Sequence, residues 1–379
     1  MHLTRNHRND DSRHGLNLDR AHHHSESEDL SDYRKHLSAK WIVLFSLAVI
    51  LVITAVVSAS VGSSGISPLE VVRVLFGAGA DASRTIVLNV RIPQIATGIA
   101  VGVALAMAGC IMQNVLRNPL ASASTLGIAQ GASFGAAVAI VFFQAGVQLG
   151  AASAVTHTIT SPYLVVIFAF LGGIATTAVI LLLARVSGVS PTSLILAGVA
   201  LSAMFTAGTA LIQYFADDIR IASIVHWTFG NLGRAGWNEI AIIFAFNAVA
   251  LIYFIYNRWN YNAIEAGNDT AKSLGVNVDG TVLAGMTIST LISAVAIAFV
   301  GTINFIGLIA PHIVRRLIGN DYRFLIPCSA LMGAIIILVA DIASRTIASP
   351  AILPIGALTS FMGAPLFLYL IIKQGKKAA

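Results

Sequence analysis

The sequence predicts an all-α polytopic membrane protein with ten transmembrane helices, on the evidence of its composition, its apolar segments and its basic residues. The 379 residues are 56% hydrophobic and only 11% charged, and their mean hydropathy is +0.82. A water-soluble core of this size cannot bury so large an apolar fraction. We therefore expect most of the chain to lie in a bilayer.

Nine apolar stretches are each close to the ~20 residues that a helix needs to cross a bilayer. They are residues 41–61, 92–115, 120–143, 163–185, 191–214, 238–257, 282–303, 324–347 and 353–373. A further segment, residues 305–318, is shorter and contains a proline and two arginines. Its length alone does not decide whether it crosses.

The distribution of basic residues decides this question. Residues 1–40 are polar, lack a signal-peptide cleavage site and end in a basic cluster, so we expect a disordered cytoplasmic tail. The basic residues 374–379 are expected to form a cytoplasmic tail as well, which requires an even number of crossings. If residues 305–318 are the tenth span, most basic residues near span ends lie in the cytoplasm, as the positive-inside rule requires. The transmembrane domain then comprises residues 41–373.

Other functions of the polar residues are not indicated. The net charge of +6 is assigned to membrane orientation and not to nucleic-acid binding, because no basic stripe with interleaved aromatic residues occurs. Cys110 and Cys328 form no CxxC pair and are expected to be small buried side chains, and we expect no metal site. The role of the His-rich N-terminal tail stays open.

A weak internal repeat predicts two halves of opposite orientation. Residues 106–121 and 298–313 align Gly109 with Gly301 and Pro119 with Pro311. The first copy would cross the membrane in the opposite direction to the second, which is the pattern of an inverted-topology repeat.

Glycines predict close packing between the helices. Gly127, Gly131 and Gly135 recur every four residues, and Gly98 and Gly102 lie on the preceding span. In a membrane, small residues allow helix backbones to approach closely, so a packing role is expected for these positions.

Four motifs together resemble the permease subunit of the FecCD-type ABC importers for iron-siderophores, haem and vitamin B12. They are RIP at 91–93, QNVLRNPLA at 113–121, GLIAPHIVR at 307–315, and LPIG at 353–356 with GAPLFLYLI at 363–371. The resemblance covers about residues 41–373. It implies a multi-pass protein of the bacterial inner (cytoplasmic) membrane that translocates its cargo inward.

The resemblance also implies the partners. They are a second permease subunit, identical or homologous, two cytoplasmic ABC ATPases and an extracytoplasmic substrate-binding protein. The chain has no GxxxxGK[ST] phosphate loop, so we expect no ATPase site and no bound cofactor in it. ATP and magnesium would be used by the partner ATPases.

Two arginines at the outer ends of helices, Arg91 and Arg345, match positions where the family docks its binding protein. The family often has a second arginine where this chain has Gln94, which puts one docking contact in doubt. Asp341 lies one helical turn before Arg345, so an intrahelical ion pair is the competing interpretation.

The resemblance implies a cytoplasmic gate at Asn118, Pro119 and Leu120, although Asn-Pro is also an ordinary turn signal. Four polar residues at helical spacing are candidates to line the pathway. They are Ser202, Thr206, Thr209 and Gln213. Hydrogen bonding of the hydroxyls to their own helix is an equally good interpretation.

The loop 262–280 is the only sizeable one expected in the cytoplasm, and it resembles the helices that couple such permeases to their ATPases. The residues assigned to this contact are Glu265, Gly267, Asp269, Lys272, Leu274 and Gly275. An ordinary solvated loop is the alternative.

The substrate is not encoded in any motif. A ferric siderophore is the first choice from the family, and haem or cobalamin are the alternatives. A secondary transporter driven by an ion gradient is a rival of a different class, but the interior of the spans is nearly free of the ionisable residues that it needs.

Overall fold

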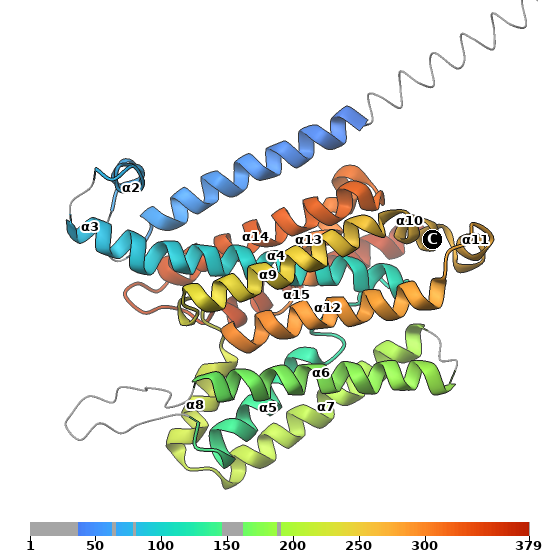
Figure 1. Ribbon diagram of the computed structural model, residues 1–379. Coiled ribbons are helices and arrows are strands. Elements are labelled where there is room, and N and C mark those ends of the chain that lie inside the picture. The colour runs from blue at the N-terminus through green and yellow to red at the C-terminus, as the bar shows by residue number, and fades with distance from the viewer. Residues whose placement is uncertain (1–36, 63–65, 79–80, 146–161, 188–190, 379) are drawn as a thin grey trace, which may run out of the picture.

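The protein is described by a computed structural model over residues 37–62, 66–78, 81–145, 162–187 and 191–378, and every regular element in these ranges is a helix (Figure 1). After the first described helix, Leu37–Ser60, the elements are α2 Pro68–Leu75, α3 Asp81–Ile86, η1 Val87–Arg91, α4 Ile92–Val115, α5 Ile128–Phe142, α6 Pro162–Ser187, α7 Pro191–Phe215, α8 Asp218–Thr228, η2 Leu232–Arg234, α9 Trp237–Tyr256, α10 Arg258–Ala266, α11 Asn268–Ser273, α12 Val278–Val300, α13 Ile306–Ile318, α14 Tyr322–Thr346 and α15 Ile355–Ala378.

Seven of the helices in these ranges are long and apolar enough to cross a membrane, and two shorter apolar helices accompany them. The seven are Leu37–Ser60, Asp81–Val115, Tyr163–Leu183, Ser193–Phe215, Trp237–Tyr256, Val278–Val300 and Tyr322–Thr346; the shorter two are Ile128–Phe142 and Ile355–Tyr369. The expected α-helical membrane fold is confirmed at this level. The predicted N-terminal tail lies outside the described residues as far as residue 36.

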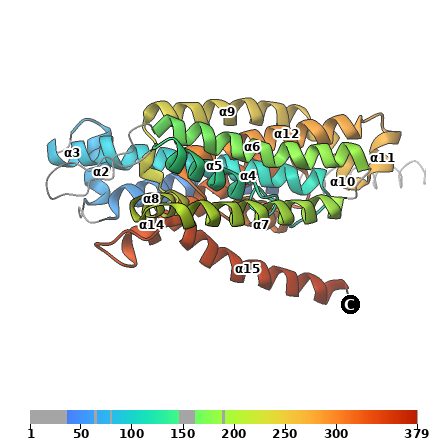
Figure 2. The same cartoon turned by 90° about the horizontal axis from the view of Figure 1, so that it is seen from below.

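The two ends of the described chain lie at the same end of the bundle. Figures 1 and 2 show the start of the first helix and the end of α15 at the end that carries α10 and α11, whereas α2, α3 and α8 lie at the opposite end. A contact agrees with this placement, because Lys40 Nζ lies 3.1 Å from Asp321 Oδ2 at the start of α14. The two ends of the described chain are therefore on the same side of the bundle, and the number of membrane crossings stays a prediction.

The second long helix begins earlier than predicted. Residues 62–90 were expected to be a connection, but α3, η1 and α4 form one continuous helix from Asp81 to Val115. The turn Val87–Arg91 directly before Pro93 is a wide π-turn. Proline has no backbone N–H and its ring crowds the preceding turn, so a wider turn lets the helix pass through Pro93 without ending.

The span predicted over residues 120–143 is wrong in its first part. The helix begins only at Ile128, and residues 116–127 form turns that are largely buried in the protein. Pro119 prevents continuation of α4, and Gly127 at the start of α5 has a left-handed φ of 81°. Non-helical backbone at membrane depth is tolerated where protein covers it, as it does here.

The segment at residues 305–318 is a helix, as predicted, and it resembles α5 in its construction. Both are short, with 15 residues in α5 and 13 in α13, and both follow a residue with a left-handed φ. Each also follows a long helix, α4 or α12. The predicted register of the repeat is wrong, however, because Gly109 lies in the middle of α4 whereas Gly301 caps the end of α12. Likewise, Pro119 lies in a turn and Pro311 inside a helix.

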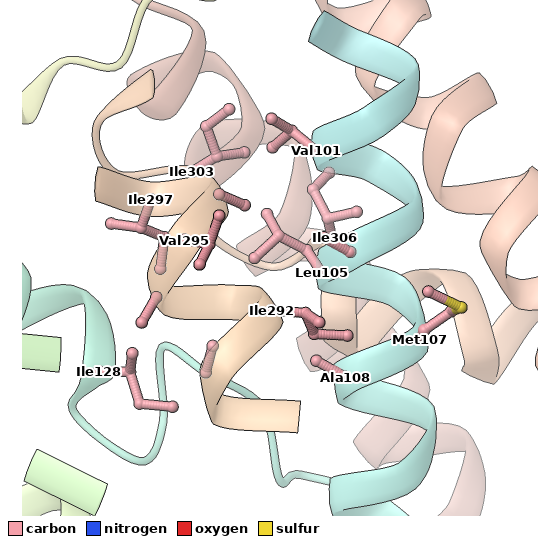
Figure 3. Close-up of a cluster of buried hydrophobic side chains, with 14 of the residues drawn as sticks. Val101, Leu105, Met107, Ala108, Ile128, Ile292, Val295, Ile297, Ile303 and Ile306 are labelled. Carbon is pink, nitrogen blue, oxygen red and sulfur yellow. The ribbon is translucent and has the colours of Figure 1, made fainter. Parts of the chain in front are cut away.

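The core of the bundle is built around α4, which packs against α12, α13 and α14. A Cβ at Gly109 would overlap the carbonyl of Gly307 in α13, and a Cβ at Gly102 would lie 2.6 Å from the Cα of Ala334 in α14. Figure 3 shows how apolar side chains of α4, among them Leu105, meet Ile292 of α12 and Ile306 of α13. The close helix packing predicted from the glycines is therefore observed around α4.

The glycines of α5 make equally close contacts with α6, as predicted. A Cβ at Gly131 would lie 2.5 Å from the carbonyl oxygen of Gly172, and one at Gly135 would overlap the carbonyl of Phe168. In contrast, α7 is peripheral. Only 6% of the most apolar stretch of α7 is buried inside the protein, whereas 78% of the corresponding stretch of the helix Asp81–Val115 is buried.

Replacing Gly109 with alanine is expected to destabilise the protein. The added methyl group overlaps backbone atoms of α13, which cannot rotate away, so α4 and α13 must separate. Overpacking of this kind typically costs about 1–3 kcal/mol. Thermal unfolding in detergent should show a lower midpoint for Gly109→Ala than for the control Gly173→Ala, whose methyl group meets side-chain carbons at 3.2 and 3.3 Å. Equal midpoints would contradict the packing argument.

Candidate functional site

A cluster of polar side chains joins α10 to three helices of the core at the α10–α11 end. We call Gln113, Asn114, Glu265, Arg315 and Tyr322 the polar junction. The carboxylate of Glu265 accepts hydrogen bonds from Asn114 Nδ2 at 3.1 Å and from the Tyr322 hydroxyl at 3.2 Å. Its other oxygen accepts from Asn320 Nδ2 at 2.8 Å. Glu265 therefore binds groups from α4 and from the beginning of α14.

Arg315 completes the junction from α13. Its Nη1 donates to Gln113 Oε1 at 2.6 Å, and its Nη2 donates to the Tyr322 hydroxyl at 3.1 Å. Gln113 in turn donates to the carbonyl of Gly307 at 3.2 Å, and Asn114 donates to the carbonyl of Tyr261 at 3.1 Å. Charged and neutral hydrogen bonds thus connect α4, α10, α13 and α14 in one network.

Asp321 forms a second anchor beside the junction. It caps α14, accepts from Lys40 and Arg323, and receives a longer bond of 3.4 Å from Asn262 of α10. Burial raises the pKa of this carboxyl, but the hydrogen bonds from Arg323 and Lys40 outweigh burial and hold the pKa well below its usual range. The carboxylate is therefore charged at neutral pH and ties α10 and the first helix to α14.

The residues assigned to ATPase coupling divide into two groups. Glu265 is exposed at one side but is hydrogen-bonded to the core helices through the polar junction. Gly267 and Gly275 lie on either side of α11 and have positive φ values of 130° and 81°. The remaining three, Asp269, Lys272 and Leu274, are exposed. Leu274 is 69% exposed, which is unusual for a leucine outside lipid and leaves an apolar tip on the loop.

The predicted gate residues lie in a turn that directly follows α4. Asn118 Oδ1 accepts from the backbone N–H of Leu120 at 2.9 Å, and the carbonyl of Asn118 accepts from Ala121. Pro119 is exposed and Leu120 half-buried. The turn is therefore observed, and the gating role of these residues stays a prediction.

The two docking arginines have different surroundings. Arg345 donates to Asp341 Oδ2 at 2.6 Å, to the hydroxyl of Ser58 at 2.7 Å and to the carbonyl of Val61 at 2.9 Å. Asp341 also accepts from Gln94 at 2.8 Å. The intrahelical pair is thus present, and the guanidinium of Arg345 is bound inside the protein.

Arg91 is also buried, at 8% exposure, but its Nε has no hydrogen-bond partner among the described residues. A Cβ at Gly62 would overlap the Arg91 guanidinium, so only glycine leaves room for it there. Arg345 and Asp341 are its charged neighbours. Of the two predicted docking residues, Arg91 is therefore the one with an unsatisfied donor.

The hydroxyl groups of α7 make hydrogen bonds to their own helix, which was the alternative to lining a pathway. Ser202, Thr206 and Thr209 each donate to the carbonyl four residues earlier in the same helix, at 2.8, 2.8 and 2.9 Å. Thr206 is exposed, and Ser202, Thr209 and Gln213 are half-buried. A pathway-lining role for these four stays a prediction.

The FecCD transport family matches residues 50–373 of the chain. This chain belongs to the FecCD transport family. It is 51% identical to an ABC transporter permease protein of Methanocaldococcus jannaschii over 91% of this chain and 98% of the relative. It is 35% identical to the hemin transport system permease HmuU of Yersinia pestis over 88% of this chain and 96% of the relative.

A solved structure of a metal-chelate type ABC transporter in an inward-facing conformation is also similar. It has a TM-score of 0.74 at 30% identity and covers 87% of this chain and 99% of its own. The family predicted from the motifs is thus confirmed, and the protein is a multi-pass membrane permease of the FecCD type.

Several residues of this FecCD permease that build the sites were not singled out from the sequence. Asn114 and Arg315 lie inside two of the family motifs, but Tyr322, Asn320 and Ser58 do not. Polar residues at the ends of apolar helices are costly unless they have hydrogen-bond partners. Their presence at these positions in the sequence was therefore a signal that they take part in polar contacts. It did not reveal which residues pair.

Removing the carboxylate of Glu265 is expected to loosen α10. Glu265→Ala leaves the buried Tyr322 hydroxyl without its acceptor and Asn114 with only the carbonyl of Tyr261, and an unsatisfied buried donor costs about 1–3 kcal/mol. Thermal unfolding of the purified permease should show a clear decrease for Glu265→Ala and almost none for Asp269→Ala, an exposed carboxylate on the same loop. A similar decrease in both variants would mean that the junction does not stabilise the fold.

Neutralising Arg345 is expected to be strongly destabilising. Arg345→Gln leaves the buried charge of Asp341 without its cation, and breaking a buried pair in this way costs about 3–5 kcal/mol. The double variant Arg345→Gln with Asp341→Asn removes both charges and should recover part of the loss. A double variant no more stable than the single one, by denaturant or thermal unfolding, would exclude the ion pair as the cause.

Proposed function

We propose that this chain is a permease subunit of a binding-protein-dependent ABC importer that moves a ferric siderophore inward, driven by ATP hydrolysis on partner ATPases. The family and the similarity to a metal-chelate transporter support the reaction class. The observation that carries the proposal is the exposed tip at Leu274, on a loop that the polar junction ties to α4.

The orientation in the membrane follows from the basic residues. Lys40, Arg315 and Arg323 lie at the α10–α11 end, together with the two ends of the described chain. The positive-inside rule assigns this end to the cytoplasm. Ten segments then cross, including the short helices α5 and α13, each of which is preceded by a non-helical segment that the protein partly covers.

The loop α10–α11 is the part that the ATPase would hold. In this proposal, Leu274 inserts into an apolar groove of the ATPase, and Asp269 and Lys272 lie at its edge. ATP and magnesium bind between the ATPases and close them, which displaces α10. Because Glu265 and Tyr261 are hydrogen-bonded to Asn114, the displacement reaches the end of α4.

The turn at Asn118–Leu120 begins four residues beyond Asn114, so movement of the end of α4 changes its position. We place the cytoplasmic gate in this turn, with Leu120 closing the pathway against its counterpart in a second permease. The peripheral helix α7 supports a paired assembly, because its large apolar side chains, such as Leu196 and Leu211, are 64% and 63% exposed. The pair is a homodimer or a dimer with a homologue.

The binding protein would deliver its ligand at the α2–α3 end. Arg91 is the arginine that we assign to this contact, because its Nε lacks a partner whereas Arg345 is bound to Asp341. Charges at the edge of such an interface raise the association rate and fix the register more than they raise affinity.

The proposal predicts ATP-dependent uptake that fails when the loop is disturbed. The chain is reconstituted in vesicles with its ATPase and binding protein, and uptake of ferric siderophore, hemin and cobalamin is compared. Accumulation of the ferric siderophore with ATP is expected. Preferential uptake of hemin or cobalamin would contradict the substrate, and uptake under an imposed ion gradient without the ATPase would contradict the transporter class.

In the same vesicles, Gly275→Glu is expected to decrease uptake at least tenfold relative to ATP hydrolysed. Its φ of 81° strains a residue with a side chain, and the new charge lies beside the apolar tip. Ser273→Glu places the same charge on the exposed last residue of α11 without a left-handed φ, and it should decrease coupling less. Normal coupling in Gly275→Glu would remove the loop from the mechanism.

A further inference from the structure

A cavity of about 140 Å³ lies at the α2–α3 end between the beginnings of α6 and α9, the short helix η2 and the end of α12. Its polar lining is Tyr163, Arg234 and Glu239, and its apolar lining includes Val166, Trp227 and Phe299. Trp227 is only 2% exposed and forms one wall of the cavity.

The guanidinium of Arg234 is the unusual group in this cavity. Its Nη1 is buried and has no hydrogen-bond partner among the described residues, and its Nη2 makes one long bond of 3.4 Å to the carbonyl of His226. Burial lowers the pKa of Arg234 to about 10, so the side chain is still charged at neutral pH. The Arg234 side chain is half-buried, and a buried N–H of a cation without a partner is costly, so an anion in the cavity would remove that cost.

The carboxylate in the same cavity does not serve as that partner. Glu239 accepts from the Tyr163 hydroxyl at 2.9 Å through one oxygen and from the backbone N–H of Gly236 at 2.9 Å through the other. It thereby caps the start of α9. Among the described residues, no ion pair joins it to Arg234.

The position of the cavity indicates what kind of anion reaches it. The spans of α6 and α9 begin here, and Tyr163 and Trp237 at their starts are 58% and 55% exposed, as expected of aromatic residues at a membrane boundary. The cavity is therefore at the level of lipid headgroups. Apolar side chains of α6 and α12, Val166 and Phe299, line it beside the charged group.

We propose that this cavity binds the phosphate of a membrane phospholipid, with Arg234 Nη1 donating to a phosphate oxygen and the glycerol region lying against Val166 and Phe299. A guanidinium is well suited to phosphate, and the apolar lining suits the part of the lipid that follows the headgroup. The site is built from one chain and does not depend on the transport reaction.

The test is native mass spectrometry of the full-length chain from nanodiscs of phosphatidylethanolamine and phosphatidylglycerol. The wild-type protein is expected to retain one phospholipid. The fraction of protein with this bound lipid should be at least tenfold lower for Arg234→Gln. Arg73→Gln, which removes an exposed arginine of α2 at the same end, is the matched control and should behave as wild type. Equal retention in Arg234→Gln and wild type would overturn the proposal.

A second variant keeps the arginine and fills the cavity. Val166→Phe is expected to decrease lipid retention in the same way, so the result does not depend on the folding of Arg234→Gln. Two competitors then identify the ligand. Displacement of the lipid by millimolar inorganic phosphate would assign the cavity to a soluble anion, and equal retention of a galactolipid without phosphate would reduce the contact to apolar packing. Either result would overturn the proposal.

Discussion

The closeness of α4 to its neighbours is the constraint on which the rest of the structure depends. Lipid surrounds apolar helices as readily as other helices do, so their association needs backbones that approach closely. Gly102 and Gly109 give α4 this contact with Ala334 and Gly307 on α14 and α13. Because these contacts fix the rotation of α4 about its axis, they also fix the direction of Gln113 and Asn114 at its end. The polar junction is therefore a consequence of the glycine contacts.

The junction in turn ties α10 to the helices of the membrane core. A polar group that is removed from water must find a partner in the protein, and here the partners come from four helices. A movement of α10 that broke these bonds would leave the buried Asn114 and Tyr322 without the carboxylate of Glu265. Displacement of α10 together with the end of α4 costs less. When α11 is displaced, the network therefore favours movement of α10 together with the end of α4 over deformation of the loop alone.

The sequence was informative about segments and much less so about pairs. Apolar stretches located most of the long helices, and glycine spacing located the close contacts, because both signals are local. The start of α5 at Ile128 was missed because residues 120–127 contain no charged residue, and these mostly small residues form turns that the rest of the protein partly or fully covers. The pairing of Arg345 with Ser58 and Val61 was invisible, since these residues lie on another helix more than 280 positions away. The FecCD motifs identified the family without showing these pairs.

The internal binding of Glu265 and Arg345 changes which residues face a partner. A charge that already has its hydrogen bonds gains little from a second ligand and loses those bonds if it turns outward. In the proposed assembly, contact with an ATPase is left to the exposed Leu274 and its neighbours, and the burial of an apolar side chain depends little on salt. At the opposite end, the buried Arg91 keeps an Nε donor without a partner among the described residues. In the proposed assembly, the contact with the ATPase is therefore mainly apolar, whereas the contact with the binding protein is electrostatic.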